Sequence, residues 1–272
     1  MSESLVTTNT NNGVVHIQFN RGSKHNSLTL DMFDAIAAAG EQLHCNGDAR
    51  VAVLSGEGPS FCAGLDMSVM KTFLSADKAE AQAAMRLLER GDGPDNLAQR
   101  VGYVWHTAPV PVIAAIQGVA FGGGFQIAMG CDIRVASPAA RFCIMESRYG
   151  LIPDMSITQS IPRLMSRDQA LELTLTAREF DGTEAHRLGL VTKLADDPVA
   201  DALALAETIA ARSPDAVRRI KRLYNDAWGV DATDSFKLEA ELQQELIGRN
   251  NQVEAVRAAM EKREPRFSAA GS

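Results

Sequence analysis

Hydrophobic residues follow two different periods along the chain up to about residue 198. Val15, Ile17 and Phe19 alternate with polar neighbours, which is the period of a half-buried strand. Apolar positions recur at helical spacing over residues 30–44, which predicts a helix. Continuous short apolar runs, typical of strands buried on both faces, occupy residues 51–56, 112–116 and 133–136. Strands separated by helices in this way predict an α/β core.

Strand patterns stop after residue 198, and the rest of the chain has helical periods. Ser213 and Pro214 are typical of a helix start, with a capping side chain followed by proline in the first turn. The predicted helices lie near residues 215–228, 235–248 and 252–262. Because such a tail cannot bury its apolar positions alone, we expect it to pack on the core or on another subunit. We therefore predict a core over residues 1–198 and a helical oligomerisation region over 199–272.

Composition and charge narrow the class of protein. The chain has 272 residues, of which 46% are hydrophobic and 22% charged, as in soluble globular proteins. A net charge of −7 argues against a nucleic-acid-binding surface. The amino terminus has no apolar leader, and no apolar run reaches the roughly 18 residues of a membrane helix. We expect a cytoplasmic protein without membrane or nucleic-acid partners.

The cysteines give no sign of a metal site. They lie in apolar segments and lack the spacing of metal ligands, at Cys45, Cys62, Cys131 and Cys143. We interpret all four as buried thiols of a protein in a reducing compartment. The sequence therefore predicts no metal.

Two glycine-rich turns are the strongest candidates for chemistry. Residues 61–66 read Phe-Cys-Ala-Gly-Leu-Asp, and residues 118–126 read Gly-Val-Ala-Phe-Gly-Gly-Gly-Phe-Gln. Each turn lies between a hydrophobic strand and a helix, where glycine leaves backbone N–H groups accessible to a negative group. One turn alone would be an ordinary structural turn. The pair suggests two donors that converge on one developing oxyanion.

Taken in order, these segments resemble the crotonase superfamily, also called the enoyl-CoA hydratase/isomerase family. The resemblance covers about residues 14–267 and includes the two turns, residues 111–118, residues 131–134 and residues 142–153. It implies a spiral of strand-strand-helix units with a helical C-terminal trimerisation region, assembled as trimers or dimers of trimers. It also implies an acyl-CoA thioester substrate, a stabilised enolate and no separate cofactor. The oxyanion donors would be the N–H groups of Leu65 and Gly123.

The acidic residues at the family's catalytic positions distinguish between the possible reactions. Hydratases of this family use two glutamates to activate one water, and the matching positions here hold Gln126 and Glu146. Glutamine can orient a water molecule, but it cannot accept or deliver a proton near neutral pH. Glu146 therefore stands as the principal acid/base, and an efficient hydratase is disfavoured.

Asp154, eight residues after Glu146, resembles the second carboxylate of the dienoyl-CoA isomerases. Those enzymes also have an aspartate where this chain has Gln126. One charged and one protonated carboxylate can move a double bond without water. Asp154 could instead cap a following helix. We favour an enoyl- or dienoyl-CoA isomerase, with the hydratase, in which Gln126 positions a water for Glu146, as the alternative. A non-catalytic CoA- or RNA-binding relative is a third possibility.

Further residues are implied in binding the CoA moiety. Arg21 and Lys24 match the family's nucleotide-binding loop, which His25 would line through its backbone. The remaining expected substrate contacts come from the two turns, at Ala63, Gly64, Asp66 and Gly122. We also expect Asp66 to cap the next helix and Asp132 to pair with a basic group.

Overall fold

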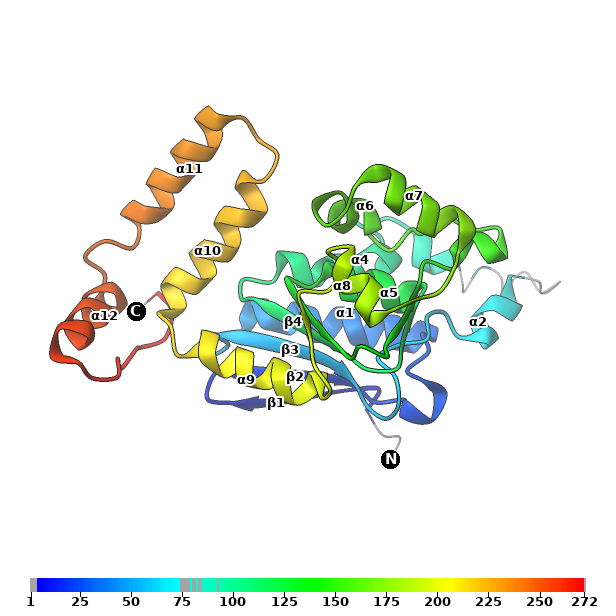
Figure 1. The fold of residues 1–272 in the computed structure, drawn as a ribbon, viewed down its shortest axis with the longest axis horizontal. Helices are drawn as coiled ribbons and strands as arrows, with labels where there is room; N and C mark the ends of the chain where they lie inside the picture. The colour runs from blue at the N-terminus through cyan, green and yellow to red at the C-terminus, as the bar shows by residue number, and fades with distance from the viewer. Residues whose placement is uncertain (1–3, 74–78, 80–81, 83–84, 92, 272) are drawn as a thin grey trace.

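The computed structural model describes residues 4–73, 79, 82, 85–91 and 93–271 (Figure 1). A six-stranded sheet forms the centre, in the order β1-β2-β3-β4-β6-β9. Only the pairing of β1 with β2 is antiparallel in this sheet. Its strands are β1 (Val6–Asn11), β2 (Val14–Phe19), β3 (Val51–Gly56), β4 (Val112–Ile116), β6 (Ile133–Ala136) and β9 (Lys193–Leu194).

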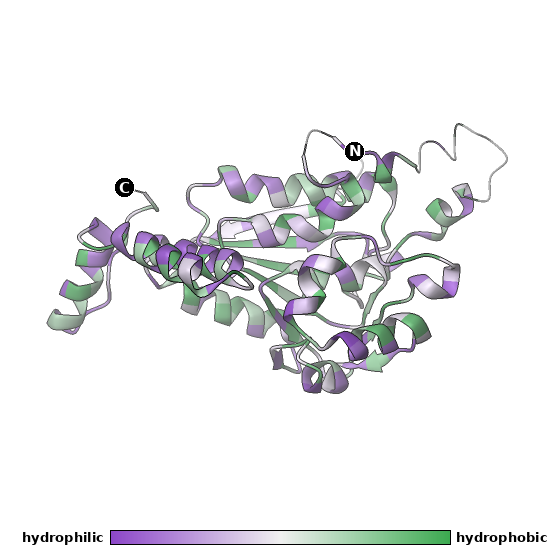
Figure 2. Cartoon of the chain, turned by 90° about the horizontal axis from the view of Figure 1, so that it is seen from above, coloured by the Kyte–Doolittle hydropathy of each residue, from purple (hydrophilic) through white to green (hydrophobic). Residues whose placement is uncertain are grey.

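Helices cover both faces of this sheet, and successive strand residues face opposite helices. Along β3, Ala52 and Leu54 belong to the core on the side of α1, whereas Val51 and Val53 pack toward α9. All six residues of β3 are buried, which confirms the prediction from its continuous apolar run. In Figure 2 these strands are mostly green, while the surrounding helices carry both colours. The helices of the two layers are α1 (Leu30–Cys45), α4 (Leu97–Thr107), α5 (Gly123–Gly130) and α9 (Pro198–Ala210).

A second, three-stranded sheet lies beside the first and gives the fold its repeating unit. Its order is β5-β7-β8, with bounds Val119–Phe121, Arg141–Cys143 and Phe180–Asp181. The chain passes from β4 to β5 and then into α5, and it passes from β6 to β7 before the next helical segment. After β3, Cys62 makes an isolated parallel bridge to Ala120 of β5. The predicted strand-strand-helix unit is therefore present as β4-β5-α5 and recurs after β6 and β7, while after β3 a single bridge residue takes the place of the second strand.

Short helical elements connect these units. They are η1 (Gly22–Lys24), α2 (Met67–Thr72), η2 (Arg86–Leu88), η3 (Glu146–Tyr149), α6 (Ile157–Ser160), η4 (Ile161–Arg163), α7 (Arg167–Thr176) and α8 (Gly182–Arg187). Asp66 is the N-cap of α2 and accepts a hydrogen bond from the N–H of Ser68, as predicted.

The chain ends in three helices, α10 (Pro214–Ala227), α11 (Ala232–Gln244) and α12 (Asn250–Glu261), which confirms the predicted helices. Figure 1 shows α10 and α11 projecting together away from the sheet. A buried ion pair helps to tie α10 to the core. Lys221 binds Asp132 at 2.8 Å, and it also donates to the carbonyl oxygens of Trp105 and Val110. The predicted pairing of Asp132 with a basic group is confirmed.

The structure tests the prediction that all four cysteines are buried. Cys62, Cys131 and Cys143 are buried, but Cys45 is exposed, so the prediction that all four are buried was wrong. Cys45 is the last residue of α1 and lies off the stripe of buried positions on that helix, which ends at Leu43.

Helix α9 begins at the predicted boundary of the tail and packs on the sheet. The division into core and oligomerisation region stays a prediction.

No helix in the described part of the chain is long and apolar enough to cross a membrane.

Candidate active site

The two glycine-rich turns lie side by side at one end of the sheets. The N–H of Cys62 donates to the carbonyl of Val119, and the N–H of Phe121 donates to the carbonyl of Cys62. A β-carbon built on Gly64 would lie 2.6 Å from the Phe121 carbonyl oxygen and 3.5 Å from the Gly123 nitrogen. The φ angle of +86° at Gly64 also favours glycine. The turns can approach this closely only because position 64 has no side chain.

This packing leaves the two predicted oxyanion donors unpaired. The N–H of Leu28 donates to the Gly64 carbonyl, and the N–H of Asp66 donates to the Leu28 carbonyl. In this parallel bridge the N–H of Leu65, between them, points to the opposite side. Gly123 is the first residue of α5. The N–H groups in the first turn of a helix have no partner within that helix. Among the described residues, neither N–H has a hydrogen-bond acceptor.

Glu146 places its carboxylate beside the second turn. A β-carbon built on Gly122 would lie 3.4 Å from Oε1 of Glu146, so a side chain there would contact the carboxylate. Oε1 accepts a hydrogen bond from Nε2 of Gln126 at 2.6 Å. Oε2 is buried and has no hydrogen-bond partner among the described residues. Burial raises the pKa of Glu146, and the charge of Asp154 raises it further. This carboxylate is suited to proton transfer.

Asp154 approaches the site from the segment before α6. Its carboxyl group is close enough to Glu146 for their charges to interact, and burial raises its own pKa. The N-cap of α6 is Ser156, and no side chain caps that helix. The interpretation of Asp154 as a helix cap was therefore wrong, because the helix begins three residues further along the chain. Its role as a second acid/base group stays a prediction.

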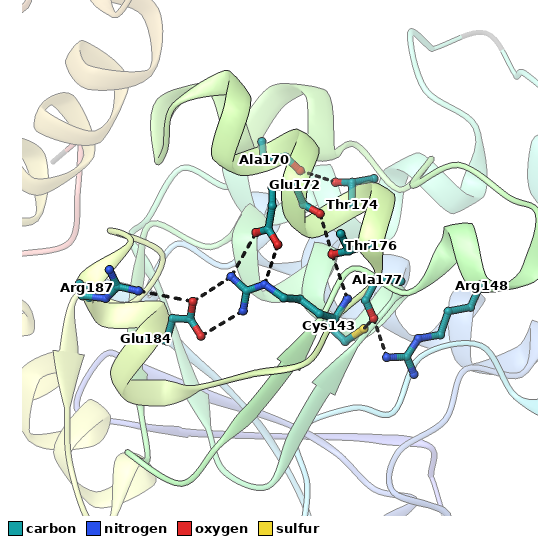
Figure 3. Close-up of polar contacts among 10 residues, drawn as sticks. Cys143, Arg148, Ala170, Glu172, Thr174, Thr176, Ala177, Glu184 and Arg187 are labelled. Atoms are coloured by element: carbon teal, nitrogen blue, oxygen red, sulfur yellow. Dashed lines mark hydrogen bonds and ion pairs between the residues drawn. The ribbon is translucent and has the colours of Figure 1, made fainter.

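The turn that carries Glu146 is fastened to the end of α7. Ser147 donates to the Thr174 carbonyl at 2.7 Å, and Arg148 donates to the Ala177 carbonyl at 2.5 Å. Figure 3 shows Arg148 and Cys143 converging on the Ala177 carbonyl, with Glu172 and Glu184 nearby. These two glutamates bind Arg178, which links α7 to α8. Glu146 thus projects from a turn that two hydrogen bonds hold to the end of α7.

The loop of predicted CoA contacts packs against the first turn. Arg21 donates to the carboxylate of Asp66 at 3.3 Å and to the Ser27 carbonyl at 2.5 Å. Ser27 also donates to Asp66, and this hydrogen bond is the main reason that the pKa of Asp66 lies below its usual range. Arg21 therefore shapes the loop and is partly committed to Asp66. Lys24 is exposed beside it.

Other predicted contacts lie in the same loop. The N–H of Ala63 donates to the His25 carbonyl at 2.9 Å, so the backbone of His25 joins the loop to the first turn. Sequence reasoning missed Ser27, which bridges Arg21 and Asp66, and Met155, whose sulfur would lie 2.7 Å from a β-carbon on Gly123. Asp66 lies 39 residues from Ser27, and Gly123 lies in another segment than Met155, so no local motif marks these contacts.

Among the described residues, no group of three or more histidine, cysteine or acidic side chains could hold a metal ion. What the site offers is two unpaired N–H donors next to two carboxyl groups of raised pKa. Such donors stabilise negative charge that develops on an oxygen atom. The carboxyl groups can accept and return a proton at nearby atoms. The arrangement therefore suits enolate chemistry.

Comparison with known proteins identifies the class. A sequence model described as enoyl-CoA hydratase/isomerase matches residues 9–270. The chain belongs to this enzyme family, as its motifs predicted.

Similar proteins include both isomerases and hydratases. The peroxisomal Delta(3,5)-Delta(2,4)-dienoyl-CoA isomerase of Arabidopsis thaliana is 32% identical, over 97% of this chain and 96% of its own. The mitochondrial methylglutaconyl-CoA hydratase of Homo sapiens is 31% identical, over 94% of this chain and 74% of its own. The crystal structure of enoyl-CoA hydratase from Bacillus anthracis superimposes with a TM-score of 0.86 at 29% identity, over 97% and 98% of the two chains. The crotonase fold predicted from sequence is confirmed.

Proposed function

We propose that this protein isomerises an unsaturated acyl-CoA by moving a double bond along the acyl chain. The observation that carries the proposal is the pair of acid/base groups, Glu146 and Asp154, beside two free N–H donors. A 32% identical relative named as a dienoyl-CoA isomerase supports the same reaction.

The proposed steps begin at the thioester. Its carbonyl oxygen accepts hydrogen bonds from the N–H groups of Leu65 and Gly123. The Glu146 carboxylate removes a proton from C2, and the electron pair moves onto the carbonyl oxygen as an enolate. Removal of one such donor in other enzymes costs about 100- to 1,000-fold in rate, so the pair supplies much of the stabilisation. Protonated Asp154 returns a proton further along the acyl chain, and the enolate collapses with the double bond shifted.

Hydration of a 2-enoyl-CoA is the second candidate, supported by the hydratases among the similar proteins. It would need Glu146 to activate a water molecule. The amide of Gln126 cannot transfer a proton, so Glu146 would act without the second glutamate. This favours isomerisation. The retained Glu146 and donor pair likewise favour an enzyme over a non-catalytic CoA- or RNA-binding protein.

The CoA moiety would be recognised at the loop around η1, which packs against the first turn. Lys24 is exposed there and can reach a phosphate, while Arg21 and His25 fix the shape of the loop. Ala63, Gly64, Asp66 and Gly122 would border the thioester. The proposal needs no cofactor beyond the CoA that the substrate carries.

A homotrimer, or a dimer of trimers, is part of the proposal. Large apolar side chains are exposed on the C-terminal helices and the turns between them, at Ile220, Tyr224, Trp228, Phe236, Ile247 and Met260. A cavity of about 600 Å³ between α4 and α10 is lined by several of them and by none of the candidate catalytic side chains. A second copy of the chain would cover this surface. Light scattering should give three or six times the chain mass of 29.2 kDa.

The test compares turnover of 2-enoyl-, 3-enoyl- and 3,5-dienoyl-CoA by the wild type, Glu146→Gln and Asp154→Asn. We expect double-bond movement in the 3-enoyl or dienoyl substrate, and its collapse in both variants. Asp48→Asn, an exposed aspartate away from the site, is the matched control. Rapid hydration of the 2-enoyl substrate that survives Asp154→Asn would contradict the isomerase and establish the hydratase.

A further inference from the structure

Gln126 is 1% exposed, and its side-chain amide contacts two separate segments. Its Nε2 donates to Oε1 of Glu146 at 2.6 Å, and its Oε1 accepts from the N–H of Met155 at 2.8 Å. A backbone N–H can only donate, so the amide oxygen must face Met155. The amino group is thereby turned toward Glu146. The chemistry of the partners fixes the orientation of the amide.

We propose that Gln126 is a positioning residue, which holds the Glu146 carboxylate in place and couples it to the segment that carries Asp154. The inference rests on the proposed function, in which these two groups transfer the proton. Gln126 belongs to α5, Glu146 to η3, and Met155 follows Asp154 directly. One side chain therefore joins the three segments that meet at the proposed reaction centre.

The hydrogen bond from Gln126 also affects the charge state of Glu146. Donation to a carboxylate favours its ionised form, whereas burial and the nearby charge of Asp154 oppose ionisation. Glu146 also faces the thiol of Cys143, whose pKa its charge helps to raise, together with the Gly122 backbone and its own turn. Gln126 therefore helps to keep Glu146 available as a base within an environment that disfavours its charge.

A glutamate at position 126 would change this arrangement. It could still accept the N–H of Met155, but it would place a second carboxylate against Glu146 in place of a donor. Two carboxylates at hydrogen-bond distance share a proton and titrate as a pair. They could also hold a water molecule between them.

The first readout of this proposal is the titration of Glu146 itself. Protein with ¹³C-carboxyl glutamate is titrated by NMR, and Glu146 is identified by the signal that Glu146→Gln lacks. Gln126→Met, which keeps the length but removes the hydrogen bonds, should raise the pKa of Glu146 because a donor to the carboxylate is lost. Gln126→Glu should raise it more, because a like charge replaces a donor. Gln42→Met, the same change at an exposed position of α1, should leave it unaltered.

The second readout is the pH profile of kcat/KM for 3-enoyl-CoA, with the hydration product quantified. We expect the acid limb to move with the pKa of Glu146, and Gln126→Glu to raise the share of hydration. An unchanged Glu146 titration in Gln126→Met would overturn the positioning role, as would a loss of activity equal at all pH values. A shifted titration without isomerisation by the wild type would keep the role of Gln126 and overturn the proposed reaction.

Discussion

Two buried polar regions of this protein contrast in how their hydrogen bonds are satisfied. Lys221, which is 7% exposed, contacts Asp132 and two backbone carbonyls. Glu146 has a buried carboxylate oxygen with no partner among the described residues, next to two unpaired N–H donors. Leaving a buried polar group unpaired costs about 1–3 kcal/mol. The fold avoids that cost at Lys221 and accepts it at Glu146, where a ligand would supply the partners.

The contrast predicts opposite effects on activity and stability at Glu146. Glu146→Gln should lower kcat/KM by about 100- to 10,000-fold, the usual contribution of general acid/base catalysis. The same variant should unfold at higher urea concentration near pH 7. Because the folded-state pKa of Glu146 is raised, the folded state binds more protons than the unfolded state, and stability falls as pH rises through that interval. Lower activity with lower stability would contradict this part of the comparison.

At Lys221 we expect the reverse effect on stability, a loss when the side chain is replaced. Lys221→Met leaves Asp132 without its cation and two carbonyls without their donor, so we expect a loss of about 3–5 kcal/mol in the free energy of unfolding. Urea denaturation measures this loss. Lys237→Met is the matched control, because that lysine is exposed on α11 and should change stability by less than about 1 kcal/mol. Similar values for the two variants would show that the contact does not anchor α10.

The raised pKa of Glu146 also predicts where activity is lost in acid. A base must be ionised, so kcat/KM should rise with pH through the pKa of Glu146. Since burial raises that pKa, the acid limb should lie above the value of about 4.3 for an ordinary glutamate. Initial rates between pH 4 and pH 8 measure the limb. A limb at or below the ordinary value would mean that Glu146 is not the base.

The smallest effect is expected at Asp66, whose contribution to stability depends on pH in the opposite direction to that of Glu146. Its pKa is lowered mainly by Ser27, so its contribution to stability is present above the ordinary aspartate pKa of about 3.9 and is lost as pH falls further. Asp66→Ala also removes the cap of α2 and should cost about 1 kcal/mol near pH 7. Asp66→Asn keeps a capping oxygen and should cost less. Thermal unfolding at pH 7 and pH 3 compares them, and a difference that grows in acid would contradict the assignment.

More of the fold than of the site could be predicted from the sequence, because the pattern that defines a strand or a helix lies within one segment. The run at residues 51–56 defines a strand by its own pattern, and the structure buries it on both sides. The two glycine turns were recognised from short motifs, and the structure brings them together. The structure contributed the partners of Gln126, which lie 20 and 29 residues away in the sequence. Such pairings depend on how α5, η3 and the following segment pack, and no period along one segment records them.

Dependence on the packing of distant segments also explains the two wrong predictions, at Asp154 and Cys45. Asp154 precedes a helix at a distance that a cap could occupy, but the path of the backbone starts that helix later. Cys45 ends a helix whose buried stripe stops two residues earlier, at Leu43. In both cases the local sequence is compatible with two outcomes. Only the position of the neighbouring elements selects between them.

The amide at position 126 has a consequence for how this enzyme could diverge. Every glutamine codon differs from a glutamate codon in its first base alone, so one transversion would exchange the donor that faces Glu146 for a second carboxylate. The N–H of Met155 would find an acceptor in either case. A single base change could therefore alter the charge beside Glu146 while both hydrogen-bonded segments keep their places.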